Sequence, residues 1–203
     1  MFKGIQKVSL IDFPGHIATT LFTGGCNFNC QWCHNRPLVE KERLKLLPDI
    51  FEEEIKAFLT HRKGKIEGVC ITGGEPTIWG ERLADFMKWC KENELLVKLD
   101  TNGYLPEVLE SYIKRGLVDF IAMDIKNNFD KYPMTVNVLN LNIERIKRSI
   151  EIIKTSGVKY QFRTTLIPGL VSKEEIEKSF SEKIYFQQYV SKLPEQKSIN
   201  GWQ

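Results

Sequence analysis

Three cysteines near the start of the chain have the types and spacing of a metal-binding loop. Cys26, Cys30 and Cys33 follow the pattern C-x3-C-x2-C within eight residues. Thiolates this close together can converge on an iron-sulfur cubane, but a cluster that only transfers electrons has four cysteine ligands, and this loop offers three. The spacing therefore predicts an iron-sulfur cluster with one iron open to a substrate.

Other interpretations fit the ligand count of this loop less well. A tetrahedral zinc site needs a fourth Cys or His, and His34 is poorly placed to bend back onto the same ion because it directly follows Cys33. A disulfide would leave one cysteine over, in a chain for which we expect no secretory leader. Three buried thiols are disfavoured because Asn, Gln and Gly surround them. Zinc is the second interpretation and a disulfide the third.

The two remaining cysteines lie in apolar surroundings. Cys70 is part of the run Gly68-Val69-Cys70-Ile71, and Cys90 follows Phe86-Met87-Lys88-Trp89. Because free cysteine packs as a small hydrophobe, both are predicted to be core residues.

Composition and charge give no sign of a nucleic-acid or membrane partner. The 203 residues include 29 basic and 26 acidic side chains, a formal net charge of +3, with no long run of either sign. No apolar run is long enough to span a bilayer. We therefore expect one domain and a cytoplasmic location, where a reducing environment keeps thiolates available for iron.

Apolar, β-branched runs alternate with helical patterns, which predicts an α/β fold with a parallel sheet. Six strands are expected, at residues 17–22, 68–72, 95–100, 118–125, 158–166 and 184–189. Helices are expected at residues 49–59, 81–93, 106–115, 142–155 and 172–179. A doubly wound sheet and a partial barrel both fit, since periodicity alone does not separate them.

Polar or glycine-rich segments follow these strands, at the end of the sheet where parallel α/β folds gather their ligand sites. They are the cysteine loop, Gly73-Gly74-Glu75-Pro76, Asp100-Thr101-Asn102-Gly103, Asp124-Ile125-Lys126, and Arg163 with Pro168-Gly169. Each taken alone is explained by turn formation or by an ordinary solvated lysine. Their placement at successive strand ends favours one shared site, in which glycines admit a ligand and Glu75 accepts hydrogen bonds from a cationic amine.

These segments resemble those of a known superfamily. The cysteine loop, with an aromatic residue before its last cysteine, and the Gly-Gly-Glu-Pro segment resemble the radical S-adenosylmethionine enzymes. His34-Asn35, residues 99–103 and residues 124–126 are similar to the glycyl-radical-enzyme activases of that superfamily. Residues 6–15, 131–133 and 162–168 are similar to the shorter, second type of anaerobic ribonucleoside-triphosphate reductase activating protein. The resemblance extends over about residues 4 to 189 and implies a partial (βα)6 TIM-like barrel with outer helices.

The resemblance implies the cofactors. Cys26, Cys30 and Cys33 would each bind one iron of a 4Fe-4S cluster, and the amino and carboxylate groups of S-adenosylmethionine would chelate the fourth iron. Trp32 would pack on the adenine, and Glu75 would hold the methionine amino group. The remaining residues implied at the cosubstrate site are His34, Gly73, Gly74, Asp100, Asp124, Lys126 and Arg163.

The resemblance also implies a cation near the cosubstrate. Asp100, Thr101, Met123 (through its carbonyl) and Asp124 match positions that surround a monovalent cation in the pyruvate formate-lyase activase.

The implied reaction is reductive cleavage of S-adenosylmethionine to a 5′-deoxyadenosyl radical, which abstracts hydrogen from a glycine of a partner enzyme. The implied partner is anaerobic ribonucleoside-triphosphate reductase, and a flavodoxin- or ferredoxin-type protein would donate the electron. Alternatives are the activase of another glycyl-radical enzyme, an enzyme similar to 7-carboxy-7-deazaguanine synthase that acts on a small molecule, and a structural iron-sulfur or zinc module. Residues 1–189 are expected to form the domain, and the polar residues 190–203 a tail that is mobile or docks a partner.

Overall fold

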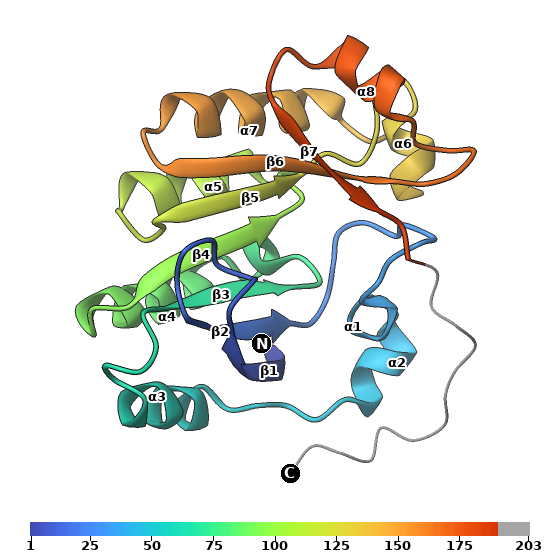
Figure 1. The fold of residues 1–203 in the computed structure, drawn as a ribbon. Helices are drawn as coiled ribbons and strands as arrows, with labels where there is room; N and C mark the ends of the chain where they lie inside the picture. Colours follow the sequence, from blue (N-terminus) through green and yellow to red (C-terminus); the bar gives the residue numbers. More distant parts are fainter. Residues whose placement is uncertain (191–203) are drawn as a thin grey trace.

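One sheet of seven strands organises the protein (Figure 1). The structure is a computed structural model that describes residues 1–190; the expected tail, apart from Val190, lies outside the described residues. The strands are β1 (Phe2–Ser9), β2 (Ala18–Thr23), β3 (Gly68–Gly73), β4 (Leu96–Thr101), β5 (Phe120–Asp124), β6 (Lys159–Leu166) and β7 (Ile184–Gln188).

The strand order decides between the two expected folds. Strands β2 to β7 pair in parallel with their neighbours in the order of the sequence, and β1 pairs antiparallel to β2. A doubly wound sheet reverses its strand order at a switch point, whereas a barrel adds each strand on the same side. The sequential order is that of a partial barrel.

Helices cover the outer face of the sheet, as right-handed crossovers between successive strands require (Figure 1). The longest are α4 (Gly80–Glu92) and α7 (Ile143–Thr155), and α5 (Pro106–Lys114) lies on the same face of the sheet. The others are α1 (Arg36–Val39), α2 (Lys41–Leu46), α3 (Glu52–His61), α6 (Tyr132–Val136), α8 (Lys173–Ser179) and a 3-10 turn, η1 (Pro76–Trp79). No helix among residues 1–190 is long and apolar enough to cross a membrane.

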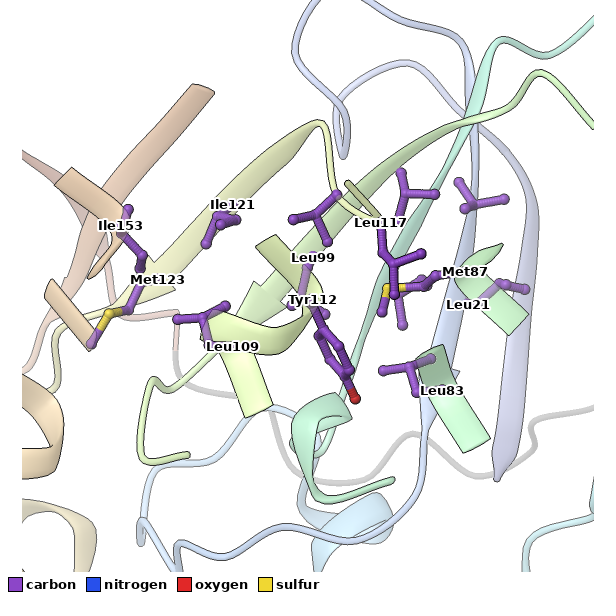
Figure 2. Packing of buried hydrophobic residues seen from close by; sticks show 14 of the residues in the cluster. Leu21, Leu83, Met87, Leu99, Leu109, Tyr112, Leu117, Ile121, Met123 and Ile153 are labelled. Atoms are coloured by element: carbon purple, nitrogen blue, oxygen red, sulfur yellow. The ribbon is translucent and has the colours of Figure 1, made fainter. Parts of the chain in front are cut away.

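The core lies between the sheet and these helices (Figure 2). Alternate residues of the strands point outward, so that Leu21, Ile71 and Leu99 are fully buried against the helices. The hydroxyl of Tyr112 on α5 donates to the carbonyl of Gly80 at 2.7 Å, which satisfies the polar group of this buried ring. Cys90 belongs to this core, as the sequence predicts.

The six parallel strands and five helices predicted from the sequence are confirmed, with bounds shifted by a few residues. Helix α3 begins at Glu52 because the backbone N–H of Ile50 donates to Phe2 of β1, which keeps the preceding residues extended. Strand β1 and the short helices α1, α2 and α6 were not predicted. β1 is an edge strand of mixed polarity, so its alternation is weak.

The inner face of the sheet is polar at its carboxyl end and closed at its amino end. The loop of residues 10–17, between β1 and β2, crosses the amino ends of the strands (Figure 1). Its Phe13 is buried, with its ring centroid 6.2 Å from that of Phe120 at the start of β5. Asp12 accepts a hydrogen bond from Thr20 on the inner face of β2.

Candidate active site

A cavity of about 190 Å³ lies at the carboxyl ends of the parallel strands. The structure brings to it every residue that the sequence analysis assigned to the cluster and the cosubstrate. They are Cys26, Cys30, Trp32, Cys33, His34, Gly73, Gly74, Glu75, Asp100, Asp124, Lys126 and Arg163. Their individual roles stay predictions, but the expected shared site exists as a geometric fact.

The cysteine loop leaves the end of β2 and is held by its own backbone and by α6. The N–H of Cys33 donates to the carbonyl of Cys30 at 3.2 Å, and the N–H of Asn29 donates to the carbonyl of Val136 at 2.9 Å. Cys30 is buried, while Cys26 and Cys33 are partly exposed. Burial, with a smaller contribution from the charge of Glu75, raises the pKa of the Cys26 thiol to about 12. Burial also raises the pKa of Cys30, so iron must displace protons from these thiols when it binds.

The donor set of the loop fits an iron-sulfur cluster. Three thiols line one cavity, yet among residues 1–190 no three His, Cys, Asp or Glu side chains are arranged to hold a single metal ion. The Nδ2 atom of Asn27, next to Cys26, is buried without a hydrogen-bond partner among the described residues. A buried N–H donor suits a neighbour that is rich in acceptor sulfurs, because hydrogen bonds to sulfur are part of how proteins hold such clusters.

Gly73 and Gly74 allow the loop after β3 to pack directly on the loop after β2. The N–H groups of Gly74 and Glu75 donate to the carbonyls of Thr23 and Gly25 at 2.9 and 2.8 Å. A Cβ atom at Gly74 would lie 1.9 Å from the carbonyl oxygen of Gly25, and Gly73 has a φ of +118°. Backbone packing therefore requires these glycines, and the close approach of a ligand that they were predicted to allow stays a prediction.

The carboxylate of Glu75 joins the segment after β3 to the segment at the end of β4. Its Oε1 accepts hydrogen bonds from the N–H and hydroxyl of Thr77 and from the hydroxyl of Thr101, and its Oε2 accepts from the N–H of Asn102 at 2.7 Å. Burial raises the pKa of Glu75, and these four donors oppose that rise. The side chain is 1 % exposed. Glu75 therefore holds the walls of the site; its contact with a methionine amino group stays a prediction.

Asn102 is a site residue that the sequence analysis did not assign. Its Nδ2 donates to Asn27 Oδ1 at 2.7 Å and lies 3.8 Å from the sulfur of Cys26. Because its N–H also bonds Glu75, Asn102 connects that carboxylate to the cysteine loop. Its place in the Asp-Thr-Asn-Gly segment was the available signal, but a turn-forming asparagine looks the same in sequence.

Five charged side chains form a continuous row across β4, β5 and β6. We call this set the charged row: Lys98, Asp100, Arg163, Asp124 and Lys126. Although burial would raise the pKa of Asp124, Arg163 and Lys126 hold it well below its usual range. Burial likewise opposes the charge of Lys126, and Asp124 outweighs it, so that the pKa of Lys126 is raised. Asp124 and Lys126 are therefore both ionised at neutral pH.

Lys98 and Cys70 lie on the inner face beneath this cavity. Cys70 was predicted to be a core residue; it is buried, but its sulfur lies 3.6 Å from Lys98 Nζ rather than among apolar side chains alone. The apolar run around it alternates between two faces of β3, and only one of these faces the helices. Nearer the surface, the ring of His34 contacts that of Tyr189, with centroids 5.6 Å apart.

The comparisons with known proteins identify the family. A family model described as the radical SAM superfamily matches residues 20–181. The chain belongs to this superfamily. It is 34% identical over 181 residues to a putative glycyl-radical enzyme activating enzyme of Methanocaldococcus jannaschii, covering 87% of this chain and 72% of that protein. It is 31% identical over 185 residues to the pyruvate formate-lyase-activating enzyme of Clostridium pasteurianum, covering 86% and 72%. These relatives confirm the predicted activating-enzyme branch and an enzyme of that kind.

The fold of this radical SAM protein also resembles solved structures. The structure of native anSMEcpe with bound AdoMet aligns with a TM-score of 0.62 at 16% identity, covering 87% of this chain and 52% of that one. The chain thus spans about half the length of that structure, and the likeness supports the partial-barrel fold alone. The superfamily implies S-adenosylmethionine and a 4Fe-4S cluster, and the thiols, the buried amide donor and the polar cavity of this chain fit both.

Proposed function

We propose that this protein is the activase of an anaerobic ribonucleoside-triphosphate reductase and installs the glycyl radical of that enzyme. The observation that carries the proposal is the convergence of Cys26, Cys30 and Cys33 on one cavity with Glu75 and the charged row. The activating-enzyme relatives support the reaction class. The similarity of residues 6–15, 131–133 and 162–168 to the shorter type of reductase activating protein supports this particular partner.

The residues of the chain bind and position rather than transfer protons. When bound, the cluster and S-adenosylmethionine supply reductive carbon-sulfur cleavage and hydrogen-atom abstraction from a glycine. The three cysteines would hold the cluster, and Trp32 would cover the adenine. Glu75 already accepts four hydrogen bonds, and Asp124 is ion-paired on both oxygens, so neither carboxylate is available as a general base. A flavodoxin- or ferredoxin-type protein of the cytoplasm would supply the electron.

The test is anaerobic reconstitution followed by electron paramagnetic resonance. We expect the spectrum of the reduced cluster to change when S-adenosylmethionine is added, and a glycyl doublet to form on the candidate reductase. The matched controls are Cys33→Ala in this chain and a reductase whose radical-bearing glycine is replaced by alanine; neither mixture should give the doublet.

Two outcomes would redirect the proposal. A doublet on a different glycyl-radical enzyme, with none on the reductase, would change the partner and keep the reaction. Turnover of a small molecule from the deazaguanine-forming branch without any protein partner would replace the proposal altogether.

A further inference from the structure

Lys98 is a buried lysine on the inner face of β4, beneath the cavity. Its side chain is 4% exposed, its ammonium group pairs with Oδ1 of Asp100, and it lies 3.6 Å from the sulfur of Cys70. An ammonium group is costly to bury unless a carboxylate compensates it. A methionine or leucine would fill this space without that cost, so the charge itself requires an explanation.

Each carboxylate oxygen of the charged row already pairs with a side-chain cation. Asp100 binds Lys98 through Oδ1 and Arg163 through Oδ2, the latter at 2.9 Å. Asp124 binds Arg163 through Oδ1 and Lys126 through Oδ2. Side-chain cations therefore hold both carboxylates that the resemblance assigned to a monovalent cation.

A third expected ligand also points elsewhere. The hydroxyl of Thr101 donates to Glu75 Oε1 at 2.7 Å and accepts from the N–H of Gly103 at 3.0 Å. The expected cation site comprises Asp100, Thr101, Met123 and Asp124. It does not fit the arrangement of this chain, because the side-chain oxygens of Asp100, Thr101 and Asp124 are already hydrogen-bonded or ion-paired within the protein.

The charge of the row shows what Lys98 contributes. Three cations and two carboxylates leave a net charge of +1 beside the cavity. A monovalent cation on the two carboxylates, with an uncharged residue at position 98, would give the same sum. Lys98 thus places on the chain the single positive charge that a bound ion would otherwise bring.

We propose that Lys98 is a built-in replacement for the monovalent cation, positioning Asp100 and Arg163 and making this site independent of K⁺ and Na⁺. The effect on the cosubstrate rests on the proposed function: the net positive row favours the carboxylate of S-adenosylmethionine. The independence from cations does not rest on it, because it is a property of the folded chain.

The decisive variants differ in whether they leave room for an ion. Lys98→Ala opens a space beside Asp100, Lys98→Met fills that space with an uncharged side chain, and Lys88→Ala removes an exposed lysine as a matched control. The thermal midpoint of the whole 203-residue chain, without cluster or cosubstrate, is measured in KCl, NaCl and choline chloride of equal ionic strength.

We expect the wild type and Lys88→Ala to melt at the same temperature in all three salts. Lys98→Ala should melt several degrees lower in choline chloride and recover at least half of that shift in KCl or NaCl. Lys98→Met should melt lower in all three salts, because no ion fits. In reconstituted protein, Lys98→Ala should raise the KM for S-adenosylmethionine roughly tenfold in choline chloride with little change in kcat, and K⁺ should reverse the rise.

Either of two results would overturn the inference. A wild-type midpoint that rises in KCl or NaCl over choline chloride would show an open cation site, and this measurement needs no variant to fold. A folded Lys98→Ala protein that no salt rescues would show that Lys98 is only a packing residue. Because the melting data involve neither cosubstrate nor partner, they stay informative if the proposed function fails.

Discussion

The two ends of the sheet are closed by different kinds of interaction. At the amino end, the loop of residues 10–17 inserts the buried ring of Phe13 against Phe120. At the carboxyl end, loops are held around a cavity by hydrogen bonds to Glu75 and by the ion pairs of the charged row.

This difference suits the amino end to stabilising the fold and the carboxyl end to positioning reactive groups. Apolar packing is non-directional and tolerates no cavity, so the amino end is suited to hold the barrel together. Hydrogen bonds and ion pairs fix directions, so the carboxyl end can keep thiols and charged groups in place around open space. Substitutions at the amino end should therefore change the free energy of unfolding without changing cofactor binding, whereas those at the carboxyl end should change both.

The largest expected effect is the loss of the cluster. Replacing Cys26, Cys30 or Cys33 by alanine should abolish cluster binding, because each thiol holds a separate iron. Cys70→Ala and Cys90→Ala should keep iron content near that of the wild type, since neither residue lies in the loop. Iron analysis and visible absorbance after anaerobic reconstitution measure this. Equal iron loss in Cys70→Ala would reopen the ligand assignment.

The next largest effect is expected from substitutions in the loop that closes the amino end of the sheet. Phe13→Ala should lower the free energy of unfolding by about 3–5 kcal/mol, because it removes a buried aromatic ring from the loop that closes the barrel. Leu10→Ala, in the same loop but 71% exposed, should change it by less than about 0.5 kcal/mol. Urea unfolding of the cluster-free chain measures both. A folded Phe13→Ala protein that no longer binds iron would contradict the hypothesis that the amino end affects stability without affecting cofactor binding.

Glu75→Gln tests the carboxyl end. The amide keeps one acceptor oxygen but presents an NH₂ group where the carboxylate now accepts hydrogen bonds, so we expect a loss of about 1–3 kcal/mol. Unlike Phe13→Ala, it should also reduce cluster retention, because Asn102 links this carboxylate to the cysteine loop. Glu53→Gln on the exposed face of α3 is the control. Full iron content in a destabilised Glu75→Gln protein would make Glu75 a stability residue alone.

The sequence predicted the parallel strands and the shared site because both depend on local patterns that repeat. Apolar runs of period two locate strands, and chemistry at their carboxyl ends follows from the parallel arrangement. Lys98 could not be assigned in this way: in sequence it is one polar residue within an apolar strand, and only the pairing of β3 with β4 shows that it meets Cys70. The closing role of Phe13 likewise depends on a contact with β5, more than 100 positions along the chain.

The smallest expected effect is a pH dependence of the unfolding free energy that arises at the carboxyl end of the sheet. Arg163 and Lys126 outweigh burial and hold the pKa of Asp124 below that of an unfolded aspartate, about 3.9. Its contribution to stability is therefore fully present above that value and is lost as the pH falls below it. The difference in unfolding free energy between the wild type and Asp124→Asn should shrink by about 1 kcal/mol between pH 6 and pH 3. The difference between the wild type and Phe13→Ala should stay constant over the same range, because no charge is removed. Urea unfolding at a series of pH values measures both differences. If neither difference changed with pH, the ion pairs of Asp124 would make no pH-dependent contribution to stability.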